Sequence, residues 1–78
     1  MRVVINNGVS DYEFLCPGSF NVGSMKAAIS SVLPVQPREM LLYYNGHPLA
    51  NGALDLCVFH VPGTELRLQL AVTVFVPQ

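Results

Sequence analysis

The sequence predicts an α+β fold, in which one helix packs on one face of a mixed sheet of four to five strands. Three observations predict it. Stretches near both ends alternate apolar and polar residues with a period of two, which is typical of half-buried strands. One stretch, residues 21–33, has apolar residues at spacings of three and four, which is typical of an amphipathic helix. Asn-Gly and Pro-Gly pairs, which favour tight turns, separate these stretches.

The first two predicted strands form a hairpin. In residues 1–5 the odd positions are apolar and face the core, and in residues 12–16 the alternation places Tyr12 and Phe14 in the core. The polar cluster 6–11 between them is a turn.

The predicted helix begins at Asn21, a favoured N-cap residue. Apolar residues recur from Val22 to Leu33, which corresponds to about three turns. Pro34 ends the helix, because the residue before a proline avoids the helical region.

A third strand is predicted over residues 40–44, followed by a turn at Asn45-Gly46 and a short extended pair, Pro48-Leu49. Two adjacent tyrosines in a strand must point to opposite faces. If Leu42 and Tyr44 face the helix, Leu41 and Tyr43 face outward.

Residues 53–64 have no regular period, and their apolar residues are predicted to be buried loop anchors: Leu54, Leu56, Val58 and Val61. Leu66, Leu68 and Leu70 then alternate with polar residues in a last half-buried strand. The order is β-β-α-β-β, which indicates a roll of the β-grasp type with the last strand beside the first.

Composition excludes several classes of protein. Apolar residues make up 51% of the chain and charged residues 12%, so disorder is not predicted. The net charge is −1 and no basic stripe exists, so nucleic-acid binding is not expected. No apolar run is long enough to span a bilayer or to form a signal peptide. No membrane association is therefore expected, and the expected location is cytoplasmic or nuclear.

Candidate chemical groups are few. Two cysteines, Cys16 and Cys57, are predicted to be reduced, half-buried thiols, with a single bridge as the alternative. His47 and His60 have no further ligands at zinc-site spacing, so no metal or cofactor is expected. A nucleophilic pair of Cys57 and His60 is formally possible, but so small a domain has little room for an oxyanion hole, and no enzyme activity is expected.

The sequence resembles ubiquitin and the ubiquitin-like domains over residues 1 to about 72. The stretch Val22-x-x-Met25-Lys26-x-x-Ile29 is similar to the family's helix pattern. The stretch "LLYYNGHPLANG" is similar to its third strand and following turn, and Pro37 lies where the family has a proline-containing bend. The resemblance implies the β-grasp fold over residues 1–72, with 73–78 as an apolar tail or the start of a linker.

The sequence departs from ubiquitin at the positions that conjugation uses. It contains no Gly-Gly pair, Lys26 is its one lysine, and His47 stands where the best-known chain-forming lysine would be. The resemblance therefore implies a non-conjugating domain within a larger protein. A modifier whose mature C-terminus lies elsewhere is the disfavoured alternative.

The resemblance also implies a binding surface, because family members contact partners through the exposed sheet face. Position by position, that surface comprises Val9, Leu41, Tyr43, His47, Arg67 and Gln69, with Leu41 and His47 at its rim. The expected partner is a helical or extended protein segment, with a role in ubiquitin or proteasome pathways. Gln69 replaces an apolar residue of the family's surface. A structural β-grasp domain without such a role is the alternative.

The apolar stretch 72–76 is the last feature that the sequence singles out. Uncharged β-branched and aromatic residues form an edge that pairs readily with another strand. A monomer is expected, with weak self-association through residues 72–76 as the alternative.

Overall fold

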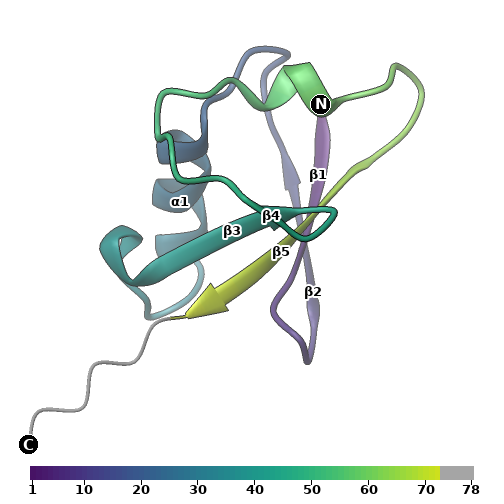
Figure 1. Ribbon diagram of the computed structural model, residues 1–78. Helices are drawn as coiled ribbons and strands as arrows, with labels where there is room; N and C mark the ends of the chain where they lie inside the picture. Colours follow the sequence, from purple (N-terminus) through teal and green to yellow (C-terminus); the bar gives the residue numbers. More distant parts are fainter. Residues whose placement is uncertain (73–78) are drawn as a thin grey trace, which may run out of the picture.

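A two-layer arrangement of one sheet and one helix is seen in the computed structural model, which describes residues 1–72 (Figure 1). Its elements, in chain order, are β1 (Arg2–Asn6), β2 (Asp11–Leu15), α1 (Val22–Ser30), the 3₁₀ helix η1 (Pro37–Glu39), β3 (Met40–Tyr44), β4 (His47–Pro48), the 3₁₀ helix η2 (Leu56–Phe59) and β5 (Leu66–Val72).

The five strands form one mixed sheet in the order β2-β1-β5-β3-β4. β1 and β5 run parallel, while the pairs β1–β2, β3–β5 and β3–β4 are antiparallel. α1 lies across one face of this sheet (Figure 1). This is the predicted β-grasp arrangement, with the last strand beside the first.

The face of the sheet that α1 covers, called here the inner face, carries the core. Val3 and Ile5 from β1, Leu42 from β3 and Leu68 from β5 are at most 1% exposed, and they cluster with Met25 and other apolar residues of α1. Tyr44 packs against this cluster and stacks on Phe59, with ring centroids 4.5 Å apart. The inward assignment of Tyr44 is therefore confirmed.

α1 is shorter than the sequence pattern predicted. It begins as expected, with the Asn21 side chain accepting a hydrogen bond from the Ser24 N–H at 2.7 Å. It ends at Ser30, with Ser31 as the C-cap, and the Ser31 hydroxyl donates to the Ala28 carbonyl in the last turn. Val32 consequently lies beyond the helix and is 57% exposed, so its predicted place on the buried helical face was wrong.

Of the four apolar residues predicted to be buried in the irregular stretch 53–64, two pack in the core and two are exposed. Leu56 is fully buried and Leu54 packs against the core, as expected. Val58 and Val61 are instead 65% and 60% exposed. The 3₁₀ helix η2 accounts for Val58, because a short helical turn directs only part of its side chains inward, whereas Val61 lies beyond η2 in the turn that precedes β5.

A polar clamp holds η2 against the start of α1. The Asp55 carboxylate accepts hydrogen bonds from the Ser19 hydroxyl and from the backbone N–H groups of Phe20 and Cys57. These bonds lower the pKa of Asp55 well below its usual range, the Ser19 hydroxyl having the largest effect. Asp55 thus caps η2.

Candidate functional site

The face of the sheet away from α1, called here the outer face, is the predicted binding surface. Strand register places its side chains in rows, because residues directly opposite each other point to the same side. One row crosses the whole sheet: Asp11, Asn6, Gln69, Tyr43 and Pro48. The neighbouring row contains Glu13, Val4 and Arg67.

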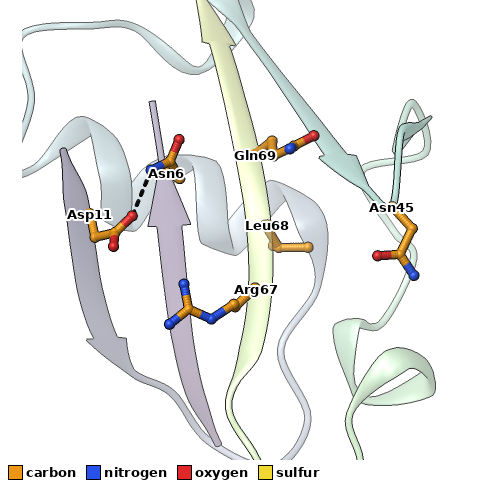
Figure 2. Close-up of a pocket in the computed structure, with 6 residues that line it drawn as sticks. All are labelled: Asn6, Asp11, Asn45, Arg67, Leu68 and Gln69. Atoms are coloured by element: carbon orange, nitrogen blue, oxygen red, sulfur yellow. Dashed lines mark hydrogen bonds between the residues drawn. The ribbon is translucent and has the colours of Figure 1, made fainter. Parts of the chain in front are cut away.

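A depression of about 310 Å³ lies on this face, and it is mainly polar (Figure 2). The side chain of Arg67 extends over β1 on one side, while Asn45 approaches from the turn between β3 and β4 on the other. The residues lining the depression are Asn6, Asp11, Asn45, Arg67, Leu68 and Gln69. Arg67 and Gln69 of the predicted surface therefore line one hollow.

Exposed polar contacts join some of the side chains on this face. The Asn6 amide donates to the Asp11 carboxylate at 2.7 Å (Figure 2), and Arg67 donates from two nitrogens to one Glu65 oxygen at 3.1 and 2.8 Å. Arg2 pairs with Glu13 at 2.8 Å, which raises the pKa of the Arg2 guanidinium. The outer face thus carries one amide–carboxylate contact and two separate ion pairs.

Apolar side chains border the polar depression at β3. Tyr43 lies between Gln69 of β5 and Pro48 of β4, and it is half-buried. Leu41 lies beside Ala71 and is 43% exposed. Since Tyr44 packs on the inner face, the alternation that predicted an outward Tyr43 is confirmed in register.

Val9 and His47, the two remaining predicted residues, lie away from this border. Val9 is 90% exposed in the turn between β1 and β2, which the Asn7 side chain braces by accepting from the Val9 and Ser10 N–H groups. His47 is the register partner of Tyr44, so it lies at the sheet edge on the side of Tyr44. The structure therefore does not place His47 on the outer-face rim beside Tyr43.

Pro48 takes the place that was predicted for His47. A two-residue turn at Asn45-Gly46 pairs Tyr44 with His47 and therefore Tyr43 with Pro48. Positive φ angles of 50° at Asn45 and 80° at Gly46 show that this tight turn forms. The Asn-Gly signal was present in the sequence, and counting outward from it identifies Pro48.

The chemistry of the Cys57–His60 pair does not fit nucleophilic catalysis. The His60 ring is in hydrogen-bonding contact with the Thr64 carbonyl at 3.0 Å. Hydrogen bonding to Asp55 raises the pKa of the Cys57 thiol, whereas a nucleophilic cysteine needs a lowered one. Both cysteines are free in the structure, with Cys16 buried and Cys57 exposed, so the prediction that both thiols are half-buried was wrong.

Within residues 1–72, no group of three or more potential metal ligands comes together. Within the same residues, no helix has the length and apolar character that crossing a membrane requires.

Comparison with known proteins identifies the fold. No protein-family model matches the sequence, and no curated protein matches it. Among solved structures, ATBAG1 in complex with HSP70 is 18% identical with a TM-score of 0.82, over 94% of this chain and 40% of that one. The ubiquitin of Caldiarchaeum subterraneum is also 18% identical with a TM-score of 0.82, over 96% of this chain and 95% of that one.

A third match is the ubiquitin-like domain of an Arabidopsis thaliana protein, 22% identical with a TM-score of 0.72, over 95% of this chain and 76% of that one. At these identities the likeness shows the fold. The chain has the ubiquitin-like β-grasp fold, as its sequence predicted.

Proposed function

We propose that this chain is a non-conjugating ubiquitin-like interaction domain that binds a protein partner through the β3 side of its outer face. The observation that carries the proposal is the border at β3, where Leu41 is 43% exposed and Tyr43 is half-buried beside Pro48. An aromatic anchor next to exposed apolar surface, rimmed by polar groups, is the usual arrangement at the centre of a protein interface.

The polar depression favours a partner with its own hydrogen-bonding groups. Asn6, Asn45 and Gln69 present side-chain amides, which can both donate and accept. A helical or extended segment with one apolar side chain over Tyr43 and polar side chains over the depression fits this surface. Arg67 and Gln69 belong to its polar part.

The solved ATBAG1 structure supports a protein-binding role within a larger protein. In it, a chain that contains this fold is in complex with HSP70, and the matching part is 40% of that chain. We extend the proposal to a cytoplasmic or nuclear role in ubiquitin or proteasome pathways.

The test compares matched variants against identified partners. Proteins captured by the wild-type domain are identified and purified, and their affinities are measured by calorimetry for the wild type, Leu41→Ala, Tyr43→Ala and Val58→Ala. Val58 is an exposed apolar residue outside the outer face, so it serves as the control. We expect Tyr43→Ala to weaken the affinity for at least one partner about tenfold or more, and Val58→Ala to leave that affinity unchanged.

If no captured partner loses affinity with Tyr43→Ala or Leu41→Ala, the outer-face assignment is wrong. The structural alternative is then favoured, in which the domain packs within a multidomain protein. A separate incubation with ubiquitin-activating enzyme and ATP tests the non-conjugating part of the proposal. A thioester adduct on this chain would contradict that part alone.

A further inference from the structure

The edge of the sheet formed by β2 has unpaired backbone groups in a defined register. Met1 and Cys16 exchange both of their backbone hydrogen bonds, the one from the Cys16 N–H to the Met1 carbonyl being 2.7 Å long. In an antiparallel ladder, bonded pairs alternate with non-bonded pairs. The bonded pairs therefore continue at Val3–Phe14 and Ile5–Tyr12.

The residues between these bonded pairs point their backbone groups out of the sheet. They are Asp11, Glu13 and Leu15, and each presents one N–H and one carbonyl along the free side of β2. No other described segment pairs with that side. The opposite edge of the sheet differs, because β4 has only two residues and one of them, Pro48, has no N–H to donate.

The side chains of β2 select what can pair with it. Asp11 and Glu13 both project to the outer face, and β2 contains no basic residue. Glu13 is already paired with Arg2, while Asp11 is held by the neutral amide of Asn6. Two copies of β2 paired antiparallel about Glu13 would place Glu13 against Glu13, so this edge resists self-association.

Apolar side chains complete the pattern. Tyr12 and Phe14 point to the inner face but stay half-buried, because no strand lies beyond them. Leu15 is 84% exposed on the outer face. An added strand would cover all three if it placed apolar residues opposite them.

We propose that β2 binds an extended basic segment of another protein, which adds a sixth strand antiparallel to β2. Lysine or arginine lies opposite Asp11 and Glu13, and apolar residues lie opposite Tyr12, Phe14 and Leu15. Main-chain hydrogen bonds supply affinity and the alternate side chains supply specificity. This edge is separate from the β3 border of the outer face, so the proposal does not rest on the proposed function.

The probe is a peptide whose centre is Val-Val-Lys-Val-Lys, flanked by Gly-Ser on one side and Ser-Gly on the other, with blocked ends. Paired antiparallel, its five central residues face Leu15, Phe14, Glu13, Tyr12 and Asp11 in turn. Titration is followed by nuclear magnetic resonance of the backbone amides and by their hydrogen exchange. We expect the N–H groups of Asp11, Glu13 and Leu15 to shift most and to exchange more slowly when the probe is bound.

Charge reversal provides the decisive comparison. Asp11→Lys combined with Glu13→Lys is expected to weaken binding of the lysine probe on the order of tenfold, because the favourable pair at Asp11 is lost and both positions then repel the lysines of the probe. The same variant should bind a probe with glutamates in place of the lysines better than the wild type does. Should the double variant fail to fold, Asp11→Asn is used instead, with a smaller loss expected. Val58→Ala, at an exposed apolar position outside β2 and the outer face, is the control and should bind the lysine probe as the wild type does.

Three results would overturn the proposal. One is the absence of shifts in β2 at millimolar probe. Another is a set of shifts confined to Leu41, Tyr43 and Gln69, which would place the peptide on the outer face. The third is slow exchange at β2 together with a dimeric mass before any probe is added, which would show that a second copy occupies the edge.

Discussion

Val3 and Val4 are neighbours of the same residue type, and both are buried, yet they belong to different parts of the molecule. Val3 is fully buried on the inner face, within the core cluster. Val4 is 6% exposed but faces outward, where its register partners are Glu13 and Arg67. The inner face excludes water with rigid apolar packing, whereas the outer face does so locally with long charged side chains.

Burial and membership of the core are therefore separate properties. Long side chains can cover an apolar neighbour while their charged ends remain in water. Figure 2 shows Arg67 extending over β1, the strand that holds Val4. A surface covered in this way can open to a partner at little cost, which suits the outer face for binding.

The largest expected difference in stability is between variants of Leu68 and Gln69, which are adjacent residues on opposite faces of β5. Leu68→Ala leaves a cavity in the core and should lower the free energy of unfolding by about 2–5 kcal/mol. Gln69→Ala removes an exposed side chain and should change it by about 0.5 kcal/mol or less. Urea denaturation of both variants measures this, and equal losses would break the distinction between the two faces.

A smaller difference in stability is expected between variants of the two valines. We expect Val3→Ala to cost roughly 2–3 kcal/mol, because its neighbours are fixed in the core. Val4→Ala should cost about 1 kcal/mol, because the flexible side chains of Glu13 and Arg67 can settle into the space. Thermal and urea unfolding of the two variants provide the measurement. A Val4→Ala loss as large as that of Val3→Ala would show that the outer face is packed as rigidly as the core.

The smallest expected effect is the pH dependence of stability, which arises from the polar clamp at Asp55 and not from apolar packing. Asp55 has a lowered pKa in the folded state, so its contribution to stability is present above its unfolded pKa of about 3.9 and is lost as the pH falls through the folded value. The urea concentration at the unfolding midpoint of the wild type should therefore decrease as the pH is lowered below about 4. The Asp55→Asn variant has no ionisable group at this position, so its urea midpoint should decrease less steeply between pH 4 and pH 2. Parallel curves for the two proteins would argue against the clamp, and Leu68→Ala should leave the pH dependence unchanged.

Periodic signals predicted the inner face of this fold well. The alternation in β1, β3 and β5 identified which residues face the helix, and Asn21 was correctly identified as the helix N-cap. These predictions succeeded because burial of one face imposes a period on the sequence. Where no period exists, as in residues 53–64, Val58 and Val61 were wrongly predicted to be buried.

The outer face was harder to predict because its properties depend on neighbours from several strands. The sequence period assigns Val4 outward but does not say that Glu13 and Arg67 flank it. The polar depression likewise joins Asn6, Asn45 and Gln69 from separate parts of the chain. The prediction of self-association through residues 72–76 lies, apart from Val72, outside the described residues.

The parallel pairing of β1 with β5 also sets the order of events when the chain is synthesised. The β1–β2 hairpin is local and can form within about 1–10 μs. Its partner β5 is the last strand, with Leu66 pairing to Val3. At about 5–20 residues added per second, the hairpin waits roughly 3–11 s for β5 to be made. During that time the side of β1 that will pair with β5 is a second open edge, rich in valine and isoleucine, and a chaperone that shields it would act in this interval.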